Sequence, residues 1–185
     1  MPIDRKKFFD GIRQQPFDGK LNAGQVAGVT AILDEWERRG LSDLRFLAYM
    51  LATTKHETAH TMQPITEYGS QSYLRGKKYW PWVGRGYVQL TWEANYKAMT
   101  KLLNAAGFDV SLIEKPELAL DKKVAAFVMF EGMLRGTFTG KKLSDYFTSK
   151  STDWLNARRI INGTDKAAEI ATIAKLFFAD LQAAS

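Results

Sequence analysis

The sequence feature that most limits the possible folds is the stretch of residues 44–60, which begins as a helix that is apolar on nearly all of its sides and carries Glu57 at its C-terminal end. The apolar residues that recur there at helical spacing are Leu44, Leu47, Ala48, Leu51 and Ala52. Phe46, Tyr49 and Met50 fill the other faces. A helix that is apolar all round is stable only when other elements cover it. We therefore predict that this helix passes through the core of a mainly helical protein.

The rest of the chain indicates more helices and one long irregular segment. Helices are predicted over residues 3–13, 22–39, 91–105, 121–134, 151–161 and 165–182, with short elements at 112–119 and 143–147. Asn22, Ser42 and Thr91 are the expected N-caps, and Gly40 is an expected helix end. Residues 61–90 lack a helical period and are rich in glycine and aromatic residues, which predicts an ordered loop with a small β-hairpin near residues 65–75.

Composition narrows the class of partner but does not choose one. The chain has 185 residues, a formal net charge of +6 and no cysteine. Disulfides and thiolate metal sites are excluded, and an anionic partner such as nucleic acid, lipid or cell wall is favoured. We expect one catalytic domain over residues 1–185, without a separate cell-wall-binding domain. No apolar run is long enough to cross a bilayer and no signal peptide is evident, so we expect synthesis in a cytoplasm without an export signal.

Two carboxylates are candidates for acid–base chemistry. Glu57 ends the central helix, where the helix dipole and apolar surroundings both favour a protonated carboxyl. Such a group is a candidate general acid, and a solvated Glu at a helix end is the alternative interpretation. Glu67 follows ten residues later in the loop. Glycoside hydrolysis uses one carboxyl as acid and a second as base or nucleophile, which a helix end and a neighbouring loop can supply.

The same region contains a motif typical of zinc peptidases. Residues 56–60 read H-E-T-A-H, and these two histidines are the only ones in the chain. On a continuous helix this spacing brings two imidazoles to one zinc ion, with the Glu as general base. A third protein ligand is also needed, and neither Glu93 nor Glu131 lies in a recognisable metal motif. We predict no metal and keep a zinc peptidase or amidase as an alternative.

The loop also indicates binding of sugars or of nucleic acid. Gln89 can both donate and accept hydrogen bonds, as sugar hydroxyl and acetamido groups require, and Thr91 can hold a water molecule. The aromatic residues that can stack on sugar faces or bases are Tyr73, Tyr79, Trp80 and Trp82. Basic residues are frequent between positions 71 and 101, so a single-stranded nucleic-acid binder is the non-enzymatic alternative.

Several of these motifs occur in the order found in glycoside hydrolase family 19. They are H-E-T at residues 56–58, G-R-G-Y-V-Q-L-T-W at 84–92 with Asn95 and Tyr96, and I-I-N-G at 160–163. Together with E-Y-G at residues 67–69, they most resemble the single-domain phage endolysins of this family. Two positions depart from the family pattern. Thr164 stands where the family often has a second Gly. The family also often has an Arg on the following helix, where this chain has Glu169, so Arg158 or Arg159 would have to take the role of that Arg.

The resemblance implies a lysozyme-like, two-lobed helical fold with a small β-hairpin lining the cleft. It also implies hydrolysis of β-1,4 bonds in chitin or peptidoglycan, with Glu57 as general acid, Glu67 as the base and Thr91 holding the water. The expected substrate-binding residues are Gln89, Asn95, Tyr96, Asn162, Tyr68 and Trp82. Tyr96 and Trp92 are expected to support the cleft.

The function expected from these features is that of an endolysin that cleaves the glycan strands of bacterial peptidoglycan and lyses the host cell. A chitinase is the alternative within the same class. The expected partners are peptidoglycan and the anionic cell envelope, with no nucleic acid and no cofactor, and the protein is expected to be a monomer. It would be made in the bacterial cytoplasm and act in the periplasm after the membrane has been permeabilised.

Overall fold

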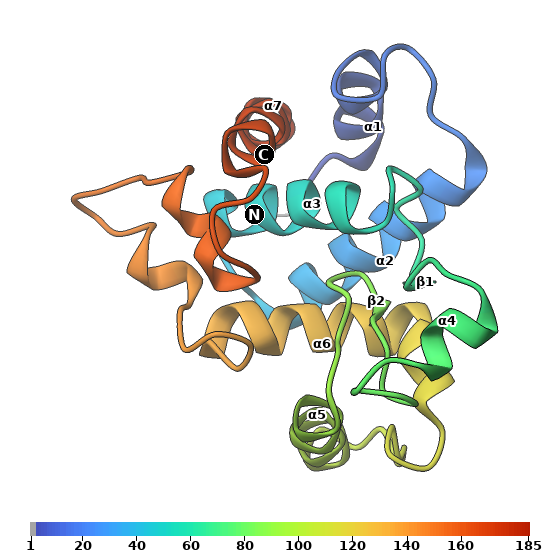
Figure 1. Cartoon of the computed structure of the whole chain (residues 1–185). Helices are drawn as coiled ribbons and strands as arrows, with labels where there is room; N and C mark the ends of the chain where they lie inside the picture. The colour runs from blue at the N-terminus through green and yellow to red at the C-terminus, as the bar shows by residue number, and fades with distance from the viewer. Residues whose placement is uncertain (1–2) are drawn as a thin grey trace.

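The computed structural model describes residues 3–185, and helices dominate it (Figure 1). Seven α-helices are present in this range: α1 Arg5–Gln14, α2 Ala23–Arg39, α3 Leu44–Glu57, α4 Gln71–Arg75, α5 Glu93–Ala105, α6 Lys122–Arg135 and α7 Ala167–Ala183. Three short 3-10 helices are η1 Pro116–Leu120, η2 Leu143–Asp145 and η3 Asn156–Ile160. Two strands, β1 Ile65–Thr66 and β2 Arg85–Gly86, complete the fold. None of the helices within residues 3–185 combines the length and the hydropathy needed to cross a membrane.

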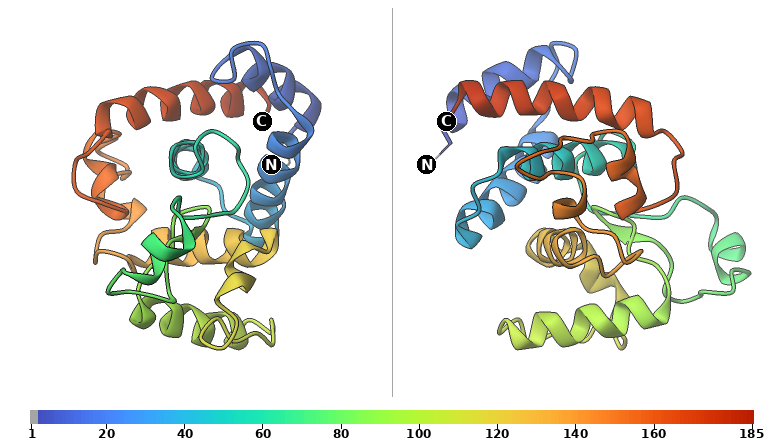
Figure 2. Two further views of the ribbon diagram at one scale, coloured as in Figure 1. Left: turned by 45° about the vertical axis from the view of Figure 1, so that its right-hand side comes forward. Right: turned by 90° about the vertical axis from the view of Figure 1, so that its left-hand side faces the viewer.

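The central position predicted for α3 is confirmed. Viewed along its axis, α3 lies inside a ring formed by α7, α2, α6 and the segment that contains η3 (Figure 2, left). All residues from Leu47 to Thr54 are fully buried. Only residues near its two ends reach solvent, so α3 supplies both the middle of the core and, at its C-terminus, a polar end.

Local capping signals explain where most helices begin and end. Asn22 and Gln25 form a reciprocal capping box at the start of α2, and Gly40 ends that helix in the left-handed conformation. Asp121 accepts hydrogen bonds from two backbone N–H groups at the start of α6. The predicted cap of α3 was one residue off: Asp43, not Ser42, accepts from the backbone N–H of Arg45 at 3.0 Å.

Three local predictions were wrong, and in the first of them a contact between segments distant in sequence decides the structure. The strand that pairs with β1 is β2, in antiparallel register with Ile65 opposite Gly86, whereas residues 71–75 of the expected hairpin form α4. The predicted helix over 151–161 reduces to η3. Thr91 does not cap α5, which follows Trp92 without a side-chain cap.

Candidate active site

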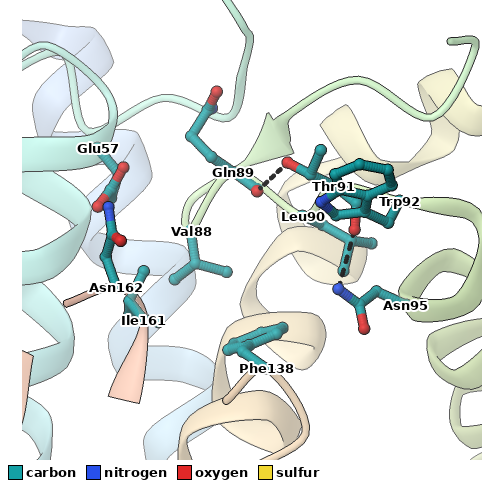
Figure 3. A pocket seen from close by; sticks show the side chains of 10 residues that line it. All are labelled: Glu57, Val88, Gln89, Leu90, Thr91, Trp92, Asn95, Phe138, Ile161 and Asn162. Atoms are coloured by element: carbon teal, nitrogen blue, oxygen red, sulfur yellow. Dashed lines mark hydrogen bonds between the residues drawn. The ribbon is translucent and has the colours of Figure 1, made fainter. Parts of the chain in front are cut away.

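Glu57 is the last residue of α3, and its carboxylate lines a pocket of about 380 Å³. Its side chain is 16 % exposed, so the carboxylate is largely shielded but reachable. Figure 3 shows Glu57 and Asn162 close together on one side of this pocket, opposite Thr91 and Asn95. The remaining lining residues are Val88, Gln89, Leu90, Trp92, Phe138 and Ile161. The pocket is therefore built from segments that lie far apart in the sequence.

Arg158 is the immediate partner of Glu57. It lies in η3, and its Nη1 donates to Oε1 of Glu57 at 2.7 Å, while its Nε donates to the carbonyl oxygen of Asp165 at 3.0 Å. Arg158 is only 2 % exposed. The sequence predicted apolar surroundings for Glu57, but the structure provides a buried ion pair, which holds the carboxylate in a defined orientation. Of the two arginines before I-I-N-G, Arg158 is the one that meets the acid, and Arg159 is exposed.

The opposite side of the pocket is a tightly turned segment. Arg85 and Leu90 exchange two backbone hydrogen bonds, and Gln89 between them adopts a left-handed backbone with φ +54°. The Nε2 of Gln89 donates to the carbonyl oxygens of Ile65 at 3.2 Å and Gly86 at 3.4 Å. Although Gln89 lines the pocket, its amide donors are thus engaged in holding the two strands. Its Oε1 is the part of the side chain left for a ligand.

Thr91 and Asn95 form the polar wall beside this turn. The hydroxyl of Thr91 donates to the carbonyl oxygen of Gln89 at 2.8 Å, and Nδ2 of Asn95 donates to the carbonyl oxygen of Thr91 at 2.9 Å (Figure 3). These bonds fix both side chains. The Thr91 oxygen can still accept a hydrogen bond, for example from water, and Oδ1 of Asn95 can accept one from a sugar hydroxyl.

Glu67 does not line the pocket but lies behind its wall. Its Oε1 accepts from the hydroxyl of Tyr79 at 2.8 Å, and its Oε2 accepts from the backbone N–H of Gly84 at 3.2 Å. The Tyr79 ring meets the ring of Trp92 edge-on, with centroids 5.2 Å apart, and Trp92 lines the pocket. Partial burial and the hydrogen bond to Glu67 raise the pKa of Tyr79. Glu67 is therefore connected to the pocket through Tyr79 and Trp92 and is not one of its lining residues.

The other residues expected to bind substrate occupy different environments. Asn162 lines the pocket. Tyr96 is fully buried and donates its hydroxyl hydrogen to the carbonyl oxygen of Val83 at 2.7 Å, so it supports the wall and cannot contact a ligand directly. Trp82 is half-buried against the core outside the pocket lining. Tyr68 also lies outside it and is 68 % exposed.

The H-E-T-A-H motif does not form a zinc site of the peptidase kind. α3 ends at Glu57, and both Ala59 and His60 have left-handed backbone conformations. His60 therefore does not stand one helical turn above His56, and its Nδ1 lies 3.4 Å from Nζ of Lys55. Within residues 3–185 no group of three potential metal-ligating side chains converges. The zinc peptidase alternative is thus incompatible with the geometry of its proposed ligands.

Phe138 is a lining residue that the sequence did not indicate. It lies in the turn after α6, in a segment without a motif, and its ring packs on Gly132 of that helix. A Cβ at position 132 would overlap the ring. In the sequence, only the glycine at position 132 could have indicated that a ring packs on this helix. A single glycine in a helix is too common to predict a pocket.

Comparison with models of known protein families finds no match, and neither does comparison with curated protein sequences. Among solved structures, the crystal structure of a chitinase C mutant is similar, with a TM-score of 0.63 at 20 % sequence identity. The alignment covers 97 % of this chain and 92 % of that one. The likeness extends over nearly the whole length of both proteins. The chain therefore has the fold of that chitinase, mainly helical and lysozyme-like with a small two-stranded antiparallel sheet.

Proposed function

We propose that this protein is a glycoside hydrolase that cleaves β-1,4 bonds in the glycan strands of bacterial peptidoglycan. The observation that carries the proposal is the position of Glu57, a shielded carboxyl at the end of the core helix that faces amide and hydroxyl groups across a pocket. The fold shared with a chitinase supports the reaction class, and the motifs at residues 56–58 and 84–92 support the same assignment.

In this proposal Glu57 protonates the oxygen of the scissile bond. The guanidinium of Arg158 hydrogen-bonds Oε1, which leaves Oε2 to carry the proton toward the sugar. Arg158 is then a positioning residue, because its second bond to the backbone of Asp165 fixes the direction from which it meets the acid. Asn162 and Asn95 hold the sugar from the two sides of the pocket.

The attacking water is placed on the opposite side, at Thr91. The Thr91 oxygen accepts a hydrogen bond from this water while its own hydroxyl group continues to donate to the carbonyl oxygen of Gln89. We propose Glu67 as the base that takes the other proton. Because Glu67 does not line the pocket and its Oε1 is engaged by Tyr79, this step requires the loop at 67–84 to shift when the sugar chain binds.

Peptidoglycan is the preferred substrate because of charge. The net charge of +6 favours an anionic polymer, whereas chitin is neutral. The biological role that we propose is that of a phage-type endolysin, made in the host cytoplasm and active on the periplasmic glycan.

The test is to replace Glu57 by Gln and to measure solubilisation of purified peptidoglycan. A positioned general acid contributes about 10²- to 10⁴-fold to the rate, so Glu57→Gln should lose activity by that factor. Because the change also removes the ion-pair partner of buried Arg158, a lower melting temperature is expected, and activity is measured well below it. Glu114→Gln, an exposed carboxylate on the surface, is the matched control and should remain fully active. Undiminished activity of Glu57→Gln would refute the assignment.

Chitin is the second candidate substrate, favoured by the likeness to a chitinase structure. Mass spectrometry of products separates the two. Release of muropeptides from peptidoglycan, with no soluble oligomers from chitin, is the expected result. Rapid release of chitin oligomers alone would transfer the assignment to chitin.

A further inference from the structure

We propose a second binding surface, next to the catalytic pocket, that takes an anionic glycan strand through aromatic stacking and cationic contacts. This aromatic–cationic surface consists of Tyr68, Tyr73, Arg75, Lys77, Trp80 and Trp92. The proposal rests on the proposed function and deepens it, because it selects peptidoglycan over chitin.

The first observation is the exposure of large aromatic side chains in this one region. Tyr68, Tyr73 and Trp92 are 68 %, 54 % and 52 % exposed, and Trp80 is 37 % exposed. Leu155 is the one other large apolar side chain within residues 3–185 with comparable exposure. Gathered exposure of this kind marks a binding surface, since a protein gains nothing in stability by holding aromatic rings in water.

The second observation is that these residues connect to the catalytic pocket. Trp92 belongs to its lining, and Tyr79 packs edge-on against Trp92. The segment then continues through α4, which lies at the edge of the molecule beside β1 and β2 (Figure 1). The Tyr73 ring packs against Gly69, where an added Cβ would come within 2.5 Å of Cδ1. The surface thus adjoins the pocket at Trp92.

The third observation is the pairing of the aromatic rings with cations. Nζ of Lys77 lies 4.0 Å from the centroid of the Tyr73 ring, and the guanidinium carbon of Arg75 lies 5.9 Å from that of Trp80. Neither cation forms an ion pair with a carboxylate in the part of the chain that the structure describes. Nζ of Lys77 also donates a hydrogen bond to the Tyr73 hydroxyl at 2.5 Å, and neither charge is neutralised by a carboxylate.

This combination fits the chemistry of a peptidoglycan strand. An aromatic face stacks on the C–H face of a sugar ring, which chitin and peptidoglycan both offer. Only the peptidoglycan strand also carries carboxylates, on its peptide stems, at the distance of a side chain from the sugar backbone. Rings and unpaired cations on one segment thus match a glycan with anionic substituents.

The experiment measures binding without turnover, using Glu57→Gln protein in sedimentation assays with intact peptidoglycan, peptidoglycan stripped of its peptide stems, and chitin. Tyr73→Ala and Trp80→Ala, each added singly to Glu57→Gln, should weaken binding to both peptidoglycan samples by about tenfold, as for aromatic anchors at other interfaces. Arg75→Gln with Lys77→Gln should weaken binding to intact peptidoglycan several-fold and leave binding to chitin, which carries no carboxylate, unchanged. Lys20→Gln with Lys150→Gln, two exposed lysines outside the pocket lining, is the control of equal charge.

Three results would overturn the proposal. They are unchanged binding in the aromatic variants, equal loss in the cationic and control pairs, and displacement from this surface by a single-stranded oligonucleotide that binds more tightly than the glycan. The proposed function fails separately, if wild-type protein binds peptidoglycan through these residues but releases no fragments from it.

Discussion

At the scale of single residues, the contact between Arg158 and Glu57 is the most informative feature of the candidate site. A helix end and its apolar neighbours would leave Glu57 without a charged partner, whereas the structure supplies a guanidinium at 2.7 Å. That guanidinium is held at two points, by the acid and by the carbonyl oxygen of Asp165. Removing it leaves a shielded carboxylate that no other side chain pairs with in residues 3–185.

We predict that Arg158→Gln lowers both stability and activity. Breaking a buried ion pair by removing one partner costs about 3–5 kcal/mol, which corresponds to a loss of roughly 6–20 °C in melting temperature for a chain of this size. Because the Glu57 side chain is 16 % exposed, we expect a loss at the lower end of this range. Calorimetry and peptidoglycan solubilisation measure the two effects. Arg159→Gln changes the exposed neighbour and should alter neither. Wild-type activity in Arg158→Gln would show that the acid needs no positioning.

Lys55 supplies a pH-dependent prediction. It is nearly buried, and burial lowers its pKa below the ordinary lysine value of 10.5. Between the lowered folded-state pKa and 10.5 the unfolded chain binds more protons than the folded one, so this group makes stability rise with pH across that window.

Replacing Lys55 by Met removes the cost of burying the charge. Lys55→Met should therefore melt at a higher temperature than the wild type near pH 7. The difference should shrink as pH approaches 10.5, because wild-type Lys55 has by then lost its proton. Melting curves of both proteins from pH 7 to 10 provide the measurement. A difference that grows with pH would contradict this account.

At the scale of elements, a helix affects the shape of the pocket through the size of its side chains, which sets how closely a neighbouring side chain can pack on it. Gly132 of α6 leaves room for the ring of Phe138, which lies over the helix and lines the pocket. In an isolated helix Ala would be preferred to Gly by about 1 kcal/mol. Here the added methyl group would overlap the ring, so packing and helix propensity have opposite effects.

We predict that Gly132→Ala destabilises the protein and lowers activity, because the Phe138 ring must leave its position in the pocket. Gly132→Ala combined with Phe138→Leu should recover stability, since the smaller side chain removes the overlap. Melting temperatures of the two single variants and the double variant test this as a double-mutant cycle. Additive losses in the double variant would show that the two residues act independently.

The sequence predicted elements well wherever local signals determine them. The apolar pattern of α3, the capping box at Asn22 and the left-handed Gly40 all depend on neighbouring residues. The prediction was wrong where contacts between distant residues determine the structure, as in the pairing of β1 with β2. It also missed the left-handed backbone of Gln89, which no local preference would favour. At the candidate site, Glu57, Gln89, Thr91, Asn95 and Asn162 line one pocket, and their catalytic and binding roles stay predictions. The contact of Glu57 with Arg158 and the position of Phe138 depend on packing between distant segments.

At the scale of the whole molecule, charge should govern how the protein finds its substrate. The net charge of +6 attracts an anionic polymer over a distance set by ionic strength, about 10 Å at 0.1 M salt and about 3 Å at 1 M. Attraction of this kind affects encounter more than the chemical step.

We predict that raising salt from 0.1 M to 1 M slows hydrolysis of peptidoglycan mainly through a higher KM, with little change in kcat. Hydrolysis of a neutral soluble oligosaccharide, if the enzyme accepts one, should be much less sensitive. Initial rates at several substrate and salt concentrations separate the two constants. A fall confined to kcat would place the effect of salt on the reaction itself.

The pairing of Glu57 with Arg158 spans 101 residues of sequence. During translation the acid therefore leaves the ribosome long before its partner does, and the nascent chain passes most of its synthesis with an unassembled centre. The candidate centre can therefore assemble only after the chain has been synthesised past residue 158.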